Sequence, residues 1–319
     1  MLEHLRKQLR NYRTLAYQTY DKFEADRDAA LRALCFIHDN RTSRENPVRF
    51  DASFFVAFSH AWDDEIEVAA ALDRLEWVVP IKGYDSFVPY NTVNIDRPST
   101  VADLAQILGE SGPLRTELDR LHLRKALQVF RKNPLSITGQ NFFDAAHPRP
   151  SDQGAFSNVL TPDWADPAAP TDAEVMDLLD SIRARFGEID AVKSELIDDD
   201  KFTDDLVIIV HNTAHYTAFK RVRDRRTLPG DVAGEENAYR GTFKLWRDGN
   251  PTAGQENYLE VLWARSNGPR PCILVLDKNP ELEAWETNAV PNGYVAVGFK
   301  LQFGLKPGDP ATTLQVQPG

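Results

Sequence analysis

Apolar residues recur at helical spacing in four parts of the chain. Proline and glycine breaks separate these parts, for example at Asn133-Pro134, where the longest stripe ends. Thr171 or Asp172 marks a helix start, because either side chain can accept hydrogen bonds from the free N–H groups of a first turn. We therefore expect helical regions at residues 1–34, 100–133, 172–186 and 213–226, and the apolar clusters of residues 50–77 also have a mostly helical pattern.

Short runs of β-branched and aromatic residues predict strands, most of them in the last third of the chain. Leu206–Val210 consists of five aliphatic residues, which is typical of a strand buried on both faces. Further strands are expected at residues 239–247, 257–265, 271–276 and 293–303. Helices followed by a strand-rich end predict an α+β fold.

Residues 76–98 differ in character from their surroundings, because prolines, aromatic and β-branched residues alternate there. We expect two extended arms of a hairpin or loop with Lys82-Gly83 midway. Prolines cannot donate to a sheet ladder, so the segment is expected at a sheet edge or projecting from the body. Its aromatic residues would then need cover from a neighbouring subunit.

The first fifteen residues carry four basic side chains and one acidic side chain, a local charge of 4 − 1 = +3. The pattern is typical of a solvated amphipathic helix, and the functional alternative is an arm that grips a neighbouring chain. This charged start without an apolar segment predicts no signal peptide.

Composition places the chain among globular proteins, since 42% of its 319 residues are hydrophobic and 27% are charged. The longest strongly apolar run has five residues, so no membrane-spanning helix is expected. Cys35 and Cys272 could form at most one bridge, and a reducing compartment such as the cytosol fits them best. The net charge of 37 − 48 = −11 argues against a free-standing DNA-binding protein.

His211 and His215 have the HxxxH spacing that places two imidazoles on one helix face for a metal ion. A zinc protease would carry Glu after the first His, where this chain has Asn212. Asp198, Asp199 and Asp200 lie upstream, but none is identifiable as a third ligand. We interpret the two histidines as cap or packing residues between a strand and a helix.

Other acidic or polar clusters have simpler interpretations. Residues 198–205 (DDDKFTDD) lack the order of an EF-hand loop, which favours a solvated acidic turn. Residues 60–65 (HAWDDE) have no nucleophile or Gly-rich turn beside them, and the sequence contains no GxSxG, GxGxxG or P-loop motif. The sequence therefore predicts no catalytic, cofactor-binding or metal site, and no enzyme activity.

Four sequence pieces carry a family resemblance. They are GQNFFDAAHP at 139–148, FSN at 156–158, RPCILVL at 270–276 with NPEL and WET after it, and YVAVGF at 294–299. In their order and spacing over residues 130–305, they resemble the Mu-like major head subunits of tailed bacteriophages. From the residues alone, Phe142, Phe143 and His147 are assigned a structural role. On an extended segment the two phenylalanines would point to opposite faces, and His147 would begin a turn.

The resemblance implies the Hong Kong 97-type capsid fold, with an N-terminal arm, an E-loop, a P-domain with a long spine helix and an A-domain. The expected order is an arm at 1–49, a helical lead-in and projecting E-loop at 50–99, and a spine helix at 100–135. Most of the A-domain is expected at 136–235, and returning strands of both domains at 236–319.

The implied function is that of a major capsid protein, located in the virion and, during assembly, in the bacterial host cytoplasm. Implied partners are further copies in pentamers and hexamers, head proteins such as portal, scaffold and decoration proteins, and weakly contacted double-stranded DNA, with no membrane. Two alternatives stay open at this point: an encapsulin-like compartment shell, and a metal-dependent hydrolase using His211 and His215.

Overall fold

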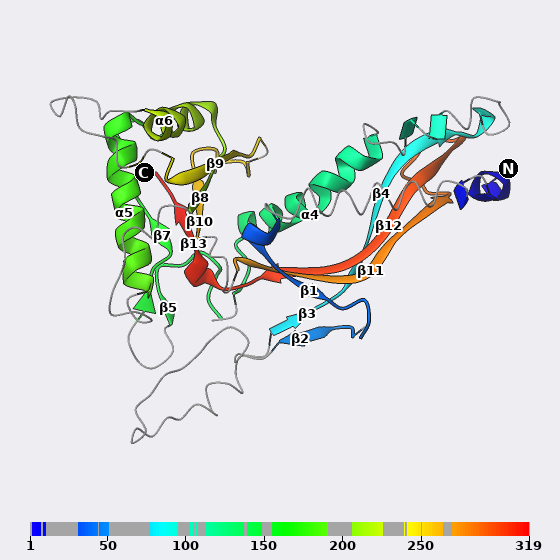
Figure 1. Ribbon diagram of the computed structural model, residues 1–319, viewed down its shortest axis with the longest axis horizontal. Coiled ribbons are helices and arrows are strands. Elements are labelled where there is room, and N and C mark those ends of the chain that lie inside the picture. The colour runs from blue at the N-terminus through cyan, green and yellow to red at the C-terminus, as the bar shows by residue number, and fades with distance from the viewer. Residues whose placement is uncertain are drawn as a thin grey trace, which may run out of the picture. The chain divides into compact units, whose positions relative to one another are not determined.

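The chain folds into two compact units in a computed structural model (Figure 1). Unit 1 comprises 1–50, 77–128 and 273–306, and unit 2 comprises 51–76, 129–272 and 307–319. Within them the structure describes residues 2–7, 9–10, 31–43, 45–50, 77–94, 103–104, 106–107, 113–136, 139–148, 155–190, 206–225, 239, 241–249, 251–263 and 270–318.

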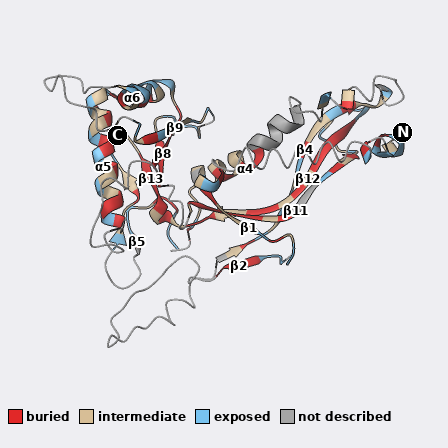
Figure 2. Ribbon diagram, viewed as in Figure 1, coloured by how far each residue is buried: buried red, intermediate tan, exposed pale blue. Residues whose placement is uncertain are grey.

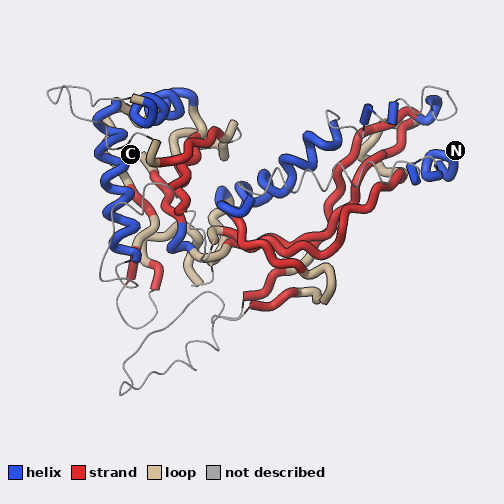
Figure 3. The backbone as a smooth tube through the Cα atoms, in the orientation of Figure 1, coloured by secondary structure: helices blue, strands red, loops and turns tan. Residues whose placement is uncertain are grey.

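Unit 1 is built on a four-stranded sheet in the order β1-β11-β12-β4. These strands are Cys35–Asp39, Cys272–Trp285, Tyr294–Pro307 and Lys82–Asn91, respectively. The two longest strands, β11 and β12, follow one another in sequence, and Figure 3 shows them running together as long curved strands. β12 pairs with β4 in antiparallel register from Tyr294↔Asn91 to Phe303↔Lys82.

The expected hairpin at 76–98 is wrong. Strand β3 (Trp77–Val79) pairs with β2 (Val48–Phe50), while Lys82-Gly83 opens β4 instead of forming a turn. The predicted edge position is confirmed, since β4 ends the strand order and contains the exposed Pro89. A 3₁₀ turn, η2 (Thr92–Asn94), follows β4.

The aromatic residues of β4 have packing partners or cover within this chain, while the contact of the 76–98 segment with a neighbouring subunit stays a prediction. Tyr84 stacks on Phe303 with ring centroids 4.0 Å apart, and Phe87 meets Trp285 edge-on at 5.6 Å. Tyr90 is buried. The two aromatic partners lie about 200 positions farther along the sequence, so the pattern of the segment itself could not reveal them.

A long helix, α4 (Pro113–Arg131), occupies the middle of the chain where the longest apolar stripe predicted one. Proline at its first position fits because that residue has no N–H to leave unpaired. Within unit 1, His122 lies edge-on to Phe303 at 4.6 Å, and Lys125 lies over the Tyr84 ring at 5.5 Å. The helix therefore packs along the strands β4 and β12.

Unit 2 contains a five-stranded sheet in the order β7-β13-β10-β8-β9. The strands are Val159–Leu160, Thr313–Val316, Leu259–Trp263, Leu206–Val210 and Phe243–Arg247. β8 runs parallel to β9 and antiparallel to β10. Every residue of β8 and β10 is buried (Figure 2), as the aliphatic run at 206–210 predicted for β8.

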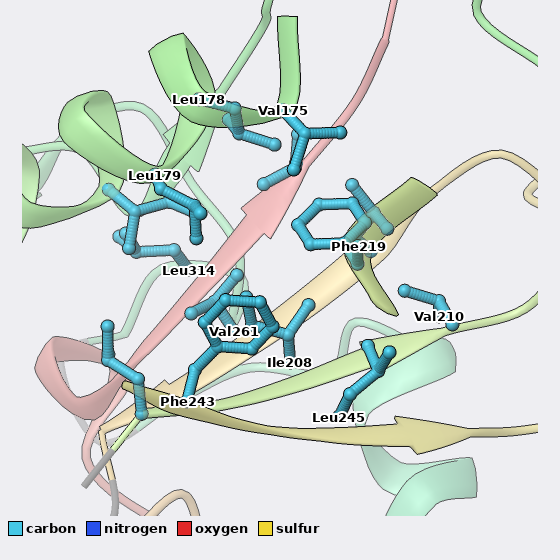
Figure 4. Close-up of a cluster of buried hydrophobic side chains, with 14 of the residues drawn as sticks. Val175, Leu178, Leu179, Ile208, Val210, Phe219, Phe243, Leu245, Val261 and Leu314 are labelled. Carbon is cyan, nitrogen blue, oxygen red and sulfur yellow. The ribbon is translucent and has the colours of Figure 1, made fainter. Parts of the chain in front are cut away.

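Two helices pack on this sheet, α5 (Asp172–Asp190) and α6 (Thr213–Asp224). Figure 4 shows Val175 and Leu178 of α5 and Phe219 of α6 in one cluster with Ile208 and Val261 of the sheet. Thr171 and Glu174 form a capping box, because Glu174 accepts from the Thr171 backbone N–H at 2.7 Å. The α+β class is confirmed.

Residues 31–34 are helical as expected, and residues 35–39 then form β1. Cys35 and Cys272 are buried thiols and do not form a disulfide. None of the described helices is long and apolar enough to cross a membrane. The interpretations of residues 60–65 and 198–205 lie outside the described residues.

Candidate functional site

The first two sequence pieces that carry the resemblance, residues 139–148 and 156–158, meet at one hydrogen-bonded junction in unit 2. The chain leaves α4 through Asn133, which has a positive φ of 43°. The Asn133 side chain then holds both backbone groups of Phe143: it accepts from the N–H at 2.7 Å and donates to the carbonyl at 3.1 Å. Phe142 N–H donates to the Pro134 carbonyl at 2.8 Å. The segment is folded back on itself by these bonds.

Gly139 completes this turn with a φ of +82°, a conformation that residues with a Cβ rarely adopt. Its N–H donates to the Ser136 carbonyl at 3.1 Å, and Ser136 N–H donates to the Gln140 carbonyl at 2.7 Å. The glycine at the start of the motif is therefore required by the backbone.

Asn158, from the second motif piece, is the centre of the junction. Its side-chain amide donates to the Phe142 carbonyl at 2.7 Å and to the Pro310 carbonyl at 3.2 Å. Its side-chain oxygen accepts from the Asp144 N–H at 2.8 Å, and its backbone carbonyl accepts from Gln315 N–H at 2.8 Å. One buried residue thus joins residues 142–144 to the C-terminal strand β13 and the 3₁₀ turn η4 (Pro310–Thr312).

His147 contacts the same carbonyl. Its Nε2 is 3.2 Å from the Phe142 oxygen, and its ring stacks on Phe156 at 5.0 Å. Because a carbonyl oxygen can only accept, Nε2 carries the proton in this contact. Burial lowers the pKa of His147, although the bond to Phe142 and the charge of Asp144 oppose the shift. The environment therefore favours the neutral ring.

The structure corrects two expectations about these residues. Phe142 and Phe143 are both buried, 0% and 4% exposed, with their rings edge-on at 5.0 Å. The reason is that the segment is bent by Asn133 and is not an extended strand. His147 does not begin a surface turn; it forms the short strand β5 (His147–Pro148), which pairs with β6 (Ala155–Phe156).

The two histidines of the HxxxH motif have separate partners. His211 Nε2 lies 2.9 Å from Glu260 Oε2, whereas His215 Nε2 lies 2.8 Å from the Pro167 carbonyl oxygen. Asn212 caps α6 by accepting from the His215 N–H at 2.7 Å. Burial lowers the pKa of His215, which packs edge-on against Trp164. His215 is thus a packing residue, as interpreted, whereas the cap is Asn212 and His211 pairs with Glu260.

A buried group of charged side chains surrounds His211, and no sequence pattern predicted it. Arg131, at the end of α4, forms an ion pair with Asp248, and His211 Nδ1 lies 3.9 Å from the same carboxylate. Burial lowers the pKa of the Arg131 guanidinium, and the charge of Glu260 opposes the shift. We call Arg131, His211, Asp248 and Glu260 the ionic cluster.

The ionic cluster has a structural explanation. Asp248 and His211 directly follow the parallel strands β9 and β8, so both lie where those strands end. Asp248 N–H donates to the Val210 carbonyl at 2.9 Å, which fixes their approach. Among the residues that the structure describes, no group of three or more His, Cys, Asp or Glu side chains is arranged to hold a metal ion.

The later motif pieces form the long strands of the sheet in unit 1. Residues 272–285 are all strand β11, longer than the expected 271–276, and 294–299 begin β12. Gly298 is required there, because a Cβ would lie 2.6 Å from the Cα of Phe87 and would also meet the Ser86 carbonyl oxygen. The motif pieces are therefore residues of the fold itself.

Of the comparisons with known proteins, the one with solved structures identifies the fold. No family model matches the sequence, and no curated protein matches it. The capsid structure of the cyanophage P-SCSP1u is similar, with a TM-score of 0.51 at 11% identity, covering 89% of this chain and 86% of that one. The mature capsid of bacteriophage PhiM1 gives 0.50 at 12% identity, with coverages of 90% and 86%. The chain has a phage capsid fold of the Hong Kong 97 type. This confirms the expected fold class.

Proposed function

We propose that this chain is the major capsid protein of a tailed bacteriophage, whose copies assemble into the icosahedral head shell around double-stranded DNA. The observation that carries the proposal is the likeness of fold over nearly the whole chain, about nine-tenths of it in each of two phage capsid comparisons. The protein then belongs to the virion, and to the host cytoplasm during assembly. Its role is structural, without a catalytic residue.

Further copies in pentamers and hexamers are the first proposed partners. Portal, scaffold and decoration proteins would be the other head proteins in contact with them. The net charge of −11 suits a shell that surrounds DNA, because a strongly basic inner face would hold the phosphates and slow packaging. Contact with DNA is therefore proposed to be weak and non-specific.

Within the phage capsid proteins, we propose a relationship to the Mu-like major head subunits. Its support is that residues 139–148 and 156–158, which carry the resemblance, meet at the Phe142 carbonyl through His147 and Asn158. Residues that form one buried junction depend on one another for their hydrogen bonds. This is a physical reason for the two sequence pieces to occur together.

The proposed domain assignment follows the two units. Unit 1 would be the P-domain with α4 as its spine helix, and unit 2 the A-domain. The helical lead-in and the E-loop are proposed within residues 50–99, as expected from the sequence. Of these residues, β3 pairs with β2 and β4 pairs with β12.

Electron microscopy of the expressed protein tests the proposal. Closed particles or rings of capsomers are expected over a range of salt and crowding conditions. A monodisperse species of 36.0 kDa under all these conditions would contradict it. Nuclease-protected DNA in particles formed with the packaging proteins is expected, whereas a protein cargo in its place would identify an encapsulin-like compartment.

A further inference from the structure

The start of the chain folds back onto unit 1. Residues 2–7 and 9–10 are helical, and we call them the N-terminal helix. Leu5 and Leu9 are 0% and 2% exposed, and Arg6 Nε donates to the Ala284 carbonyl oxygen at 3.1 Å. Figure 1 shows this helix beside the end of β11. The N-terminal helix is thus packed within its own chain.

The N-terminal helix has an apolar face that needs cover. In folded proteins most of the stability of a helix comes from packing such a face rather than from helix propensity. Leu5 and Leu9 are spaced i and i+4 and therefore share one face, while Glu3, Lys7 and Arg10 are exposed. The buried leucines and the Arg6 bond are what stabilise it.

The docking site lies on a part of β11 that β1 does not reach. β1 has five residues and β11 has fourteen, so at least 14 − 5 = 9 residues of β11 lie beyond the reach of β1. The N–H of Asn40, directly after β1, donates to the Leu276 carbonyl, and Ala284 lies 284 − 276 = 8 positions farther along. Among the strands that the structure describes, only β1 borders β11 on the side away from β12. An edge that no strand covers offers its N–H and C=O groups to another chain.

We propose that the N-terminal helix is an intrachain cover for this end of β11 and stays on its own subunit, both before assembly and in the shell. It is then not the arm that grips a neighbour. The site is tethered to the helix in every copy, so the local concentration of the helix exceeds that of any neighbour's helix. The part of the proposal that concerns shells rests on the proposed function.

Cysteine cross-linking tests the proposal. A chain carrying both Glu3→Cys and Glu283→Cys keeps Leu5, Arg6 and Leu9, and is treated with a short bismaleimide reagent, first as free subunits and then as particles. The native Cys35 and Cys272 are buried, and the chain without added cysteines measures their background. The expected product has the mass of one chain and joins the two introduced cysteines, as peptide mass spectrometry would identify.

Mixed assemblies separate contacts within a chain from contacts between chains. One partner carries only Glu3→Cys and the other only Glu283→Cys, so a covalent dimer forms only if the helix reaches a neighbour. Little or no dimer is expected. A dimer as abundant as the intrachain product, or no product in the doubly substituted chain, would overturn the proposal.

Two further variants show whether docking causes the cross-link. The double variant Leu5→Asp, Leu9→Asp should lower the yield of the intrachain cross-link about tenfold or more, since two buried apolar side chains are lost. The exposed Lys7→Asp is the matched control and should leave the yield unchanged. If particles never form, the proposed function fails, while the free-subunit result still decides whether the helix covers β11.

Discussion

The side-chain amide of Asn158 donates a hydrogen bond of 2.7 Å to the backbone carbonyl of Phe142. These residues come from two separate pieces of the family motif, 16 positions apart. The same side chain also bonds Asp144 and Pro310. The motif therefore marks a buried junction between the segment after α4 and the C-terminal strand.

Replacing Asn158 should destabilise unit 2 strongly. Asn158→Ala removes two donors and one acceptor from buried backbone groups, and each unsatisfied group costs about 1–3 kcal/mol. We expect urea unfolding to show a loss of at least about 2 kcal/mol. Ser157→Ala is the neighbouring control. The Ser157 hydroxyl is half-buried and forms its hydrogen bonds with the backbone N–H and carbonyl of Val159. Equal losses for both variants would argue against a special role for Asn158.

Both phenylalanines of the motif should matter to stability. Phe142→Ala and Phe143→Ala each create a cavity and should cost about 3–5 kcal/mol in urea unfolding. Leu135→Ala is the control in the same segment, because Leu135 is 60% exposed and its loss should cost less than about 0.5 kcal/mol. A small effect at Phe143 would show that only one ring belongs to the core.

Acid should weaken the fold through His147 and His215. Burial lowers the pKa of both histidines in the folded chain, so the unfolded chain binds protons more readily. Stability is therefore full above the unfolded value of about 6.5 and is lost as the pH falls through the lowered folded values. Urea unfolding between about pH 8 and pH 5 measures this loss. The double variant His147→Gln, His215→Gln should show a flatter pH dependence, and an unchanged slope would contradict the explanation.

Gly298 should tolerate no side chain. A Cβ there would lie 2.6 Å from the Phe87 Cα, so β12 must shift from β4, at a cost of about 1–3 kcal/mol. Gly83 is the matched control in the same strand pair, since a Cβ there meets nothing within 4 Å. Thermal or urea unfolding should rank Gly83→Ala near the parent chain and Gly298→Ala well below it.

The ionic cluster should behave as one unit. Arg131→Met leaves the Asp248 and Glu260 carboxylates buried without their cation, and breaking such a buried pair costs about 3–5 kcal/mol. Adding Asp248→Asn should restore part of the loss, which a double-mutant cycle measures. The exposed Lys132→Met controls for the loss of a positive charge at the same helix end. Additive losses would show that the two residues do not interact.

The sequence predicted a helix or strand well where the pattern of apolar residues within that segment decides its structure. The aliphatic run at 206–210 became the buried strand β8, and the stripe before Asn133 became α4. The prediction failed at Lys82-Gly83, where a local turn signal gave way to pairing with β12, and at Phe142-Phe143, where Asn133 bends the chain. In both places the deciding partner is another part of the chain, which no local pattern specifies.

The junction at the Phe142 carbonyl was likewise predictable only in part. The sequence by itself determined which residues matter, because Gly139, Phe142, His147 and Asn158 all lie in the two motif pieces. Only the tertiary structure decided what they do, because hydrogen bonds to the Phe142 carbonyl and the ion pair of Arg131 join residues that no local pattern connects. Periodicity reports which face of an element is buried, whereas a buried polar contact depends on where two elements meet.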